Sequence, residues 1–525
     1  MKSDQSLAVP VNFLYFAALV EGFSVMSLQL LGSRAVAPYF GSSIYMWTLV
    51  LGSTMTALAL GYYIGGFLSK RSAHASILTR LFVLASLAFI LDAFVYEKLL
   101  ISNLSLSLDS PKMLLLLFAI FSPLIICGML SPLIIRTINL DADNSGVAVG
   151  NVFTTISIGG IVGAFVVGFI IIPELGTTFG LKLTAGILGL YPILNYFQSK
   201  KILIGTSIAL ILTLVLILNP KVQLLQERGQ IAIVHNSDAL SGNLVVLDDL
   251  VKENRMLYMN NMAQTKMHFT GRSIWPYVYR IATFASTKPV GSEALVAGIG
   301  GGNLINELYR LNFNIDAVDI DPRIGPIAKE YFRMTDKATV IVDDARHFIN
   351  TSEKQYDVIV MDLSAGEVMP TNVYTIECFE KLRTMLKPNG LLFLHYLCSL
   401  DKDQVPALES IGNTLRASGL KANILDSHPN ENTDFTQEFM FLASNEELIF
   451  PPSSFRIEAE VAEKLKIALE GDLYYEGVDF TKGLVLSDDQ PILDHLQRAV
   501  VFKLREKSRS KVIAPLIELG HKISH

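Results

Sequence analysis

Residues 293–303 read "EALVAGIGGGN", an apolar run followed by four glycines within five residues: Gly298, Gly300, Gly301 and Gly302. The next residues, "NLINELYRL" (303–311), carry apolar side chains at helical spacing. A buried strand that passes through a glycine loop into a helix opens an α/β nucleotide-binding unit, because glycine lets the backbone approach the ligand closely. We therefore expect these four glycines to form a cofactor-binding loop.

Strand and helix patterns alternate after this loop. Apolar runs at 314–321, 338–344, 356–364 and 390–397 read as strands, and the stretch at 322–332 reads as a helix. The alternation predicts a Rossmann-like α/β domain with a parallel, doubly wound sheet.

Shorter apolar runs precede the glycine loop. They lie at 230–236, 242–249 and 255–261 and alternate with polar residues, which predicts a small antiparallel β domain. A helix is predicted near 274–287, between these runs and the loop.

Acidic residues stand where the predicted strands end, which is where such sheets bind ligands. Asp319 ends the second strand, 21 residues after Gly298, at a spacing that suits an acceptor for ribose hydroxyls. Asp343 and Asp344 end the third strand, where a carboxylate can accept an adenine amino hydrogen, and Asp362 ends the fourth. The alternative is that Asp319 and Asp344 merely cap helices.

The N-terminal half is much more hydrophobic than the rest of the chain. Segments of about the length that crosses a bilayer occur seven times before Pro220, at 11–31, 44–68, 77–96, 112–137, 146–172, 178–198 and 202–219. They predict an α-helical transmembrane bundle in contact with lipid over residues 1–220. The small β domain would then span 221–270 and the Rossmann-like domain 271–525.

Two arguments disagree on which side of the membrane the C-terminal domain lies. Basic residues in alternate loops, such as Arg71, Arg136 and Lys200, place the N-terminus in the cytoplasm, and seven spans would then put the C-terminal domain outside. A nucleotide-using enzyme belongs where its cofactor is made, inside the cell. We give the second argument more weight and expect a multi-pass protein of the cell membrane with a cytoplasmic catalytic domain.

Two features interrupt the apolar half. Glu21 lies mid-span in "ALVEGFSVM", where an ionisable residue is either functional, held by an interhelical hydrogen bond, or present as a protonated carboxyl. Residues 28–48, "LQLLGSRAVAPYFGSSIYMWT", are predicted to form an interfacial loop, with a substrate vestibule as the alternative.

Composition weighs against some classes of function. The net charge of −6 gives no support to nucleic-acid binding. The three cysteines, Cys127, Cys378 and Cys398, lack the spacing of metal ligands, so we expect buried thiols and no metal.

Taken together, these motifs resemble the spermidine synthase (polyamine aminopropyltransferase) family over about 230–400. The resemblance is to its membrane-fused branch, which carries stretches similar to "LLGSRAVAPYFGSSIY" and to "LSDDQP" (486–491). It implies a transferase whose co-substrate is decarboxylated S-adenosylmethionine and whose acceptor is a small, putrescine-like amine. A homodimer or homotetramer is also implied.

The resemblance assigns roles to individual residues. The glycine loop and Asp319 would hold the donor, with Asp344, beside Asp343, at the adenine, and Asp362 would be the catalytic aspartate. Substrate contacts are implied for Gln264 in "MNNMAQT" and for Gln230. Tyr374 and His395 could also lie near the substrate, and the alternative for each is packing or a loop contact.

Two departures from the family pattern concern the amine rather than the nucleoside. Gly301 stands where the family has an aspartate, and Ala365 stands where it has a second acid. An S-adenosylmethionine-dependent methyltransferase acting on a membrane or amine substrate is therefore an alternative. A polyamine transporter or sensor with a nucleoside-binding domain is another, and Glu21 is the residue that would support it.

Overall fold

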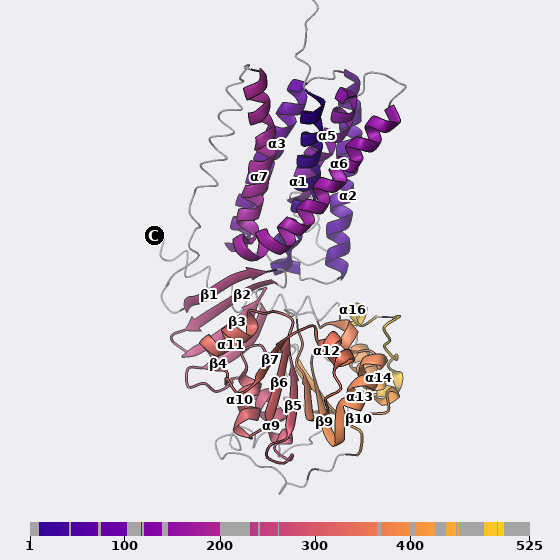
Figure 1. The fold of residues 1–525 in the computed structure, drawn as a ribbon. Coiled ribbons are helices and arrows are strands. Elements are labelled where there is room, and N and C mark those ends of the chain that lie inside the picture. Colours follow the sequence, from indigo (N-terminus) through magenta and orange to yellow (C-terminus); the bar gives the residue numbers. More distant parts are fainter. Residues whose placement is uncertain are drawn as a thin grey trace, which may run out of the picture. The chain divides into compact units, whose positions relative to one another are not determined.

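The structure is a computed structural model that describes residues 10–40, 44–71, 75–101, 117, 120–138, 145–199, 231–239, 242–260, 262–364, 369–398, 405–425, 437–447, 450, 477–490 and 492–497. The chain divides into two units, one of Met1–Leu224 with Ser237–Asn243 and one of Leu225–Asn236 with Leu244–His525. Figure 1 draws both units.

The first unit is a bundle of long apolar helices. Its described helices are α1 (Val11–Phe40), α2 (Ile44–Arg71), α3 (Ala75–Ile101), α5 (Pro123–Ile138), α6 (Ser145–Val166), the π-helical turn η2 (Val167–Ile171) and α7 (Ile172–Ser199). Helix α1 packs on α6, α2 on α5 and α3 on α7. Glycines allow these close approaches, since a Cβ at Gly22 would lie 1.9 Å from the carbonyl oxygen of Ile156.

Four helices among the described residues are long and apolar enough to cross a membrane, against the seven spans predicted. One candidate of 50 residues, Gly146–Asn195, contains the predicted span 146–172 and all but the last three residues of 178–198, and it bends at Gly176, where φ is 76°. The predicted span 112–137 is described chiefly as the 16-residue helix α5, and 202–219 lies outside the described residues.

The loop predicted for 28–48 is wrong over most of its length, because α1 continues to Phe40 and α2 begins at Ile44. Leu28, Leu31 and Ala35 recur at helical spacing and are buried. The hydroxyl of Ser33 donates to the carbonyl of Leu30, so its own helix satisfies it. Buried apolar spacing thus outweighs the local Gly and Ser content.

The second unit contains a seven-stranded sheet and most of a four-stranded one, of which residues 237–239 and 242–243 belong to the first unit. A four-stranded sheet has the order β1 (Ile231–Ala239), β2 (Gly242–Asp249), β3 (Asn254–Met259), β4 (Met262–His268), with antiparallel β2–β3 and β3–β4 pairs. Strand β4 was not predicted as a separate strand.

The larger sheet has seven strands in the order β10-β11-β9-β8-β5-β6-β7. They are β5 (Glu293–Ala297), β6 (Asn314–Asp319), β7 (Thr339–Val342), β8 (Tyr356–Met361), β9 (Leu386–Cys398), β10 (Lys421–Leu425) and β11 (Gln437–Ser444). The pairs from β9 to β7 are parallel, as predicted. Strand β11 runs antiparallel to both β9 and β10, so the sheet is mixed rather than purely parallel.

Alternating side chains of the parallel strands pack into two separate cores, one on each face of the sheet. Leu295, Ile359 and Leu392 point to the core shared with α12 (Ala345–Thr351), α13 (Ile376–Met385) and α14 (Val405–Ala417). Their neighbours Val296, Val360 and Phe393 point to the core shared with α9 (Pro276–Ala285), α10 (Asn303–Arg310) and α11 (Ile324–Phe332). The sheet therefore has helices on both faces, which explains why its strands are apolar throughout.

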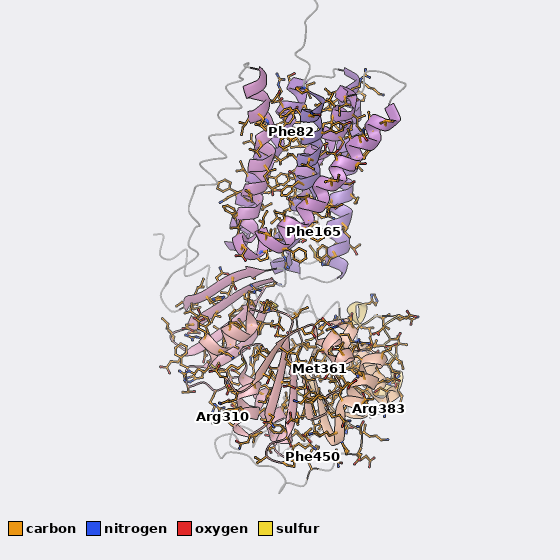
Figure 2. The ribbon with its side chains drawn as sticks, in the orientation of Figure 1. Phe82, Phe165, Arg310, Met361, Arg383 and Phe450 are labelled. Atoms are coloured by element: carbon orange, nitrogen blue, oxygen red, sulfur yellow. The ribbon has the colours of Figure 1, made fainter. Side chains whose placement is uncertain are left out.

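Figure 2 shows the side chains of both units, and each unit has its own buried core. Met361, at the end of β8, is fully buried in the second unit, and Phe82 is fully buried in the bundle. Cys127, Cys378 and Cys398 are buried as well, as predicted.

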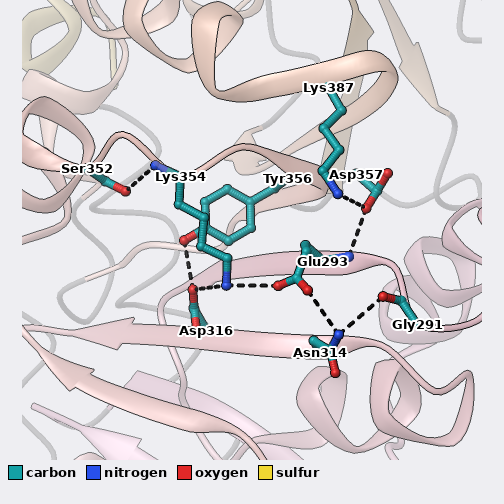
Figure 3. Close-up of polar contacts among 9 residues, drawn as sticks. All are labelled: Gly291, Glu293, Asn314, Asp316, Ser352, Lys354, Tyr356, Asp357 and Lys387. Carbon is teal, nitrogen blue, oxygen red and sulfur yellow. Dashed lines mark hydrogen bonds and ion pairs between the residues drawn. The ribbon is translucent and has the colours of Figure 1, made fainter.

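A polar network joins the starts of the parallel strands (Figure 3). Lys354 Nζ lies 2.8 Å from carboxylate oxygens of both Glu293 on β5 and Asp316 on β6. The hydroxyl of Tyr356 on β8 donates to the same Asp316 oxygen at 2.8 Å. One lysine thus bridges two neighbouring carboxylates at the edge of the sheet where the strands begin.

Replacing Lys354 by methionine should lower the free energy of unfolding by about 1 kcal/mol, because two carboxylates then face each other without a cation. Urea unfolding of the full chain measures this. The matched control is Lys482→Met, since Lys482 pairs with Asp479 on the surface, 3.6 Å away. Equal unfolding midpoints for both variants and the parent protein would contradict the stabilising role.

Candidate active site

The glycine loop links the ends of two parallel strands. The N–H of Gly298 donates to the carbonyl of Val318 on β6, and the N–H of Asp362 donates to Ala297 on β5, both at 2.8 Å. Gly298 has a φ of 92°, and a Cβ there would lie 1.9 Å from the carbonyl oxygen of Asp362. Gly300 and Gly302 also have positive φ. The tight turn therefore depends on glycine and leads into α10.

Asp319, at the end of β6, lies against this loop. One carboxylate oxygen accepts the N–H of Ile299 and the other accepts the N–H of Asp321, each at 3.0 Å. Burial raises the pKa of the Asp319 carboxyl, and these two N–H groups offset only part of the rise. Each oxygen keeps a second lone pair, so Asp319 can still accept a ligand hydroxyl. It caps no helix, in contrast to the alternative interpretation.

Asp343 and Asp344 follow β7 as predicted, but they differ in their contacts. The carboxylate of Asp344 accepts the N–H of His347 at 3.0 Å and caps α12, and its contact with an adenine stays a prediction. The carboxylate of Asp343 contacts the imidazole of His347 at 2.8 Å. Asp344 is exposed, so capping leaves room for contact with a ligand as well.

Exposed apolar side chains flank these acids. Ile320 is 64% exposed and Val342 is 56% exposed. Val342 lies opposite Asp319 in the parallel register. Exposed branched side chains beside carboxylates offer a purine ring an apolar surface together with hydrogen-bond acceptors.

Asp362 lies at the centre of a three-residue cluster. Its Oδ2 accepts the hydroxyl of Tyr277, on α9, at 2.8 Å. Its Oδ1 lies 2.7 Å from Nδ1 of His395, on β9. The two rings stack on each other, with centroids 4.3 Å apart and planes 15° apart. The carboxylate side chain of Asp362 remains 22% exposed, so a ligand can reach it.

Gln264 and Thr265 bring strand β4 to the same place. The hydroxyl of Ser364, two residues after Asp362, donates to Oε1 of Gln264 at 2.8 Å. The N–H of Gly301 donates to Oγ1 of Thr265 at 2.7 Å. The four-stranded sheet therefore contributes Gln264 to the edge formed by the glycine loop and Asp362.

The position of Gly301 has no space for a side chain. A Cβ there would lie 2.6 Å from Cγ2 of Thr265 and 3.0 Å from the ring of Phe332. The departure from the family aspartate is thus accompanied by packing that fills its place.

Tyr374 packs in the core. It is fully buried, and its hydroxyl donates to the carbonyl of His395 at 3.2 Å. Its predicted substrate contact stays a prediction, since the side chain has no exposed surface in this structure. Gln230 and Ala365 lie outside the described residues.

The "LSDDQP" segment braces helices next to the site. Asp488 pairs with Arg346 on α12 at 2.8 Å and accepts the hydroxyl of Thr375 at 2.7 Å. Arg346 also donates to the carbonyl of Asn372. The segment thus holds the start of α13 against the helix that begins at Asp344.

Sequence reasoning missed Tyr277, Thr265 and Ser364. Tyr277 belongs to an amphipathic helix with several aromatic residues, and nothing in its spacing points to Asp362, 85 residues away. Ser364 follows the strand-end aspartate by two residues, and that proximity was the available signal.

A comparison with protein families matches residues 278–408 to the spermine/spermidine synthase domain. The matched range begins in α9 and contains the glycine loop, Asp319, Asp362 and His395. The resemblance to the spermidine synthase family is thereby confirmed.

Relatives of two kinds are similar to the chain. A polyamine aminopropyltransferase 2 from Aquifex aeolicus is 21% identical over 453 residues, which cover 80% of this chain and 85% of that protein. An N-terminal histidine N-methyltransferase from Emericella nidulans is 27% identical over 188 residues, 31% of this chain and 34% of that protein. A solved structure of a probable spermidine synthase from Corynebacterium glutamicum is 17% identical, covers 47% of this chain and 88% of that chain, and has a TM-score of 0.37.

Many of these alignments are partial. The chain spans between 31% and 43% of the length of the polyamine aminopropyltransferases from Bifidobacterium longum, Clostridium beijerinckii and Vibrio vulnificus.

Proposed function

We propose, from the spermine/spermidine synthase domain at residues 278–408, that this protein is a membrane-bound aminopropyltransferase. It would transfer the aminopropyl group of decarboxylated S-adenosylmethionine to a small amine such as putrescine. The observation that carries the proposal is the placement of Asp362, a partly exposed carboxylate one strand away from a glycine loop that lies against Asp319.

Donor binding is proposed for the edge formed by β5, β6 and β7. The glycine loop lets the nucleoside approach the backbone, Asp319 accepts its ribose hydroxyls, and Asp343 and Asp344 lie at the adenine. Exposed Ile320 supports the purine ring. No residue in this set needs a metal.

The proposed reaction is a displacement at carbon. The unprotonated amine nitrogen attacks the carbon next to the sulfonium sulfur, an N–C bond forms and the C–S bond breaks. The electron pair of that bond stays on sulfur, which leaves as neutral methylthioadenosine. The nitrogen then carries one proton too many, and the Asp362 carboxylate accepts it and passes it to water.

Acceptor positioning is proposed for Gln264, since Ser364 ties its amide to the loop that carries Asp362. The remaining catalytic effect is the alignment of nitrogen, carbon and sulfur.

A second candidate is an N-methyltransferase that uses intact S-adenosylmethionine. The observation in its favour is Gly301, where Thr265 and Phe332 fill the place of the acid that the family uses for the donor amine. The similarity to an N-terminal histidine N-methyltransferase agrees with this reading. Both candidates use the same nucleoside site and the same Asp362, and differ in the alkyl group transferred.

The membrane location is part of the proposal. The four long apolar helices would hold the protein in the cell membrane, with the catalytic unit on the cytoplasmic side where both S-adenosyl donors are made.

The acceptor test uses the full-length protein in lipid nanodiscs. Each donor is supplied with a panel of diamines, monoamines and peptides with an N-terminal histidine, and the products are identified by mass spectrometry. We expect an aminopropylated amine with the decarboxylated donor. A methylated product with intact S-adenosylmethionine would replace the first candidate by the second, and no alkylated product with either donor would overturn both.

A further inference from the structure

His395 stands next to Asp362 because of strand register. Met361 pairs with Leu394 in the parallel β8–β9 ladder, so Asp362 and His395 each follow a paired residue at the same edge of the sheet. The imidazole side chain is 9% exposed, less than the 22% of the carboxylate. The histidine therefore lies behind the aspartate, away from solvent.

The geometry holds the carboxylate from two sides. His395 contacts one oxygen at 2.7 Å and Tyr277 the other at 2.8 Å, while the stacked rings fix each other in place. A carboxylate oxygen can accept two hydrogen bonds, so both oxygens keep a lone pair for a substrate.

We propose that His395 is a positioning residue that orients Asp362 and, through its own protonation, sets the lowest pH at which Asp362 can take the substrate proton. The proposal rests on the proposed alkyl transfer and deepens it. As a neutral ring, His395 donates Nδ1–H and leaves Asp362 a full acceptor. As an imidazolium, it forms an ion pair with the carboxylate and competes with the substrate nitrogen for it.

The groups that contact His395 include the carboxylate of Asp362, which follows β8, the phenol of Tyr277 on α9 and the phenol of Tyr374, which contacts the His395 carbonyl. On β11 the partner in register is Met440, which is apolar. Among these groups the carboxylate is the charged one that responds to the protonation of the imidazole, and the transfer rate should fall as the pH falls.

Two substitutions separate orientation from titration. In His395→Asn, the amide N–H can replace Nδ1–H but does not titrate. We expect this variant to keep its rate within about threefold at about pH 8, and the ratio of its rate to that of the parent to rise about fivefold by about pH 5.5. In His395→Phe, the stacked ring remains without a donor, and we expect kcat to fall about 10²-fold at every pH with little change in KM. The titration of the acceptor amine is common to all forms and cancels in the ratios.

Tyr374→Phe is the control, because it removes a hydroxyl that contacts the backbone of His395 but leaves the imidazole intact. Its rate ratio to the parent should stay constant across pH. A flat ratio for His395→Asn, or equal rates for the asparagine and phenylalanine variants, would overturn the proposal. Methylthioadenosine binding checks that each variant is folded.

An independent readout needs no turnover. Nitrogen NMR of histidine-labelled protein should show His395 as the Nδ1–H tautomer, and Asp362→Asn should change the pH at which its ring titrates. If both NMR results are observed but no alkyl transfer is found, the proposed function is contradicted and the interaction between Asp362 and His395 is supported. An unchanged titration in Asp362→Asn would overturn the pair.

A separate observation concerns Glu21 in the helix bundle. Glu21 is 1% exposed, and the hydroxyl of Ser131 on α5 donates to its Oε1. Among the described residues, its Oε2 has no hydrogen-bond partner, and the hydroxyl of Ser24, one turn further along α1, has none either. Pro132 supplies no N–H for the carbonyl of Gly128, which lies one turn before Ser131. Glu21 Oε2 and Ser24 Oγ on α1 thus have unused hydrogen-bonding capacity, and the Ser131–Glu21 hydrogen bond links α1 to α5 one turn after Gly128.

A buried carboxylate with an unused oxygen is costly unless it takes up a proton or holds a cation. The described residues contain no group of three or more His, Cys, Asp or Glu side chains that could hold a metal ion. One carboxylate with hydroxyl and carbonyl oxygens matches the N–H donors of an alkylammonium group better. We propose that Glu21 and Ser24 form a site for the ammonium group of a primary amine. The choice of an amine rests on the proposed function.

Equilibrium binding of labelled putrescine and of labelled spermidine to full-length protein in nanodiscs, without donor, tests this site. We expect Glu21→Gln to lose one class of binding sites at least about tenfold in affinity, and Asp362→Asn to keep it. Ser27→Ala is the control, since the Ser27 hydroxyl bonds to its own helix. Unchanged amine binding in Glu21→Gln would overturn the site, whereas Glu21-dependent binding in a protein without transferase activity would overturn only the proposed function.

Discussion

Replacing Asp362 by asparagine is expected to reduce the rate of alkyl transfer about 10³-fold while methylthioadenosine binding stays unchanged. The amide keeps the size of the side chain and can still contact Tyr277 and His395, but it cannot accept a proton from the attacking amine. The loss should therefore appear in kcat. Single-turnover rates and calorimetric binding of the nucleoside measure the two quantities separately.

Asp357→Asn is the matched control for this experiment. Asp357 is on the same strand, β8, but at its other end, where it contacts Lys387 Nζ and the N–H of Glu293, each at 2.8 Å. We expect its transfer rate to remain within about threefold of the parent rate, because its carboxylate is at the edge remote from the glycine loop. Full activity of purified Asp362→Asn would remove Asp362 from the mechanism.

Gly298→Ala is expected to abolish measurable nucleoside binding and to lower the free energy of unfolding by several kcal/mol. Two effects combine at this residue. Its φ of 92° is unfavourable for any residue with a Cβ, and the added Cβ would lie 1.9 Å from the carbonyl oxygen of Asp362. The chain cannot keep both the β5–β8 pairing and the loop, so the sites of Asp319 and Asp362 separate.

Gly291→Ala isolates the first of these effects. Gly291 has a similar φ of 83°, but a Cβ there would meet nothing within 4 Å. Gly291→Ala should lower the free energy of unfolding by about 1 kcal/mol and leave nucleoside binding intact. Thermal unfolding and calorimetric titration of both variants provide the comparison. If the two variants behave alike, backbone conformation alone explains the requirement for glycine and the close contact with Asp362 carries no weight.

The parallel part of the sheet could be predicted because two local signals agree there. Apolar strands such as β5 and β8 are continuous runs, and each ends at a glycine or an acid. Strand β11 could not be predicted in the same way, because antiparallel pairing at that end of the sheet depends on contacts with β9, which precedes it by more than thirty residues. A local sequence pattern predicts that a strand forms, whereas contacts with distant residues decide whether it pairs parallel or antiparallel.

The site shows the same limit. Gly298, Asp319 and Asp362 were predictable because strand ends in a parallel sheet meet at one edge. Tyr277 was not, because it reaches Asp362 from a helix that precedes the glycine loop. For Tyr374 the sequence left substrate contact and packing open, and the side chain is buried in the core in a way that only its non-local contacts determine.

In the bundle, hydropathy predicted apolar helices but misplaced their ends. The Gly- and Ser-containing stretch after Leu28 remains helical because its apolar residues face the core at helical spacing. The bend at Gly176 separates two predicted spans without interrupting the run of helices.

The central claim is that the donor's aminopropyl group is transferred, and the nucleoside co-product reports it directly. Full-length protein is incubated with an equimolar mixture of decarboxylated and intact S-adenosylmethionine and an amine acceptor, and the nucleosides are quantified by mass spectrometry, with Asp362→Asn as the blank. The account predicts methylthioadenosine that depends on Asp362 and on the acceptor. Formation of S-adenosylhomocysteine without methylthioadenosine would contradict it.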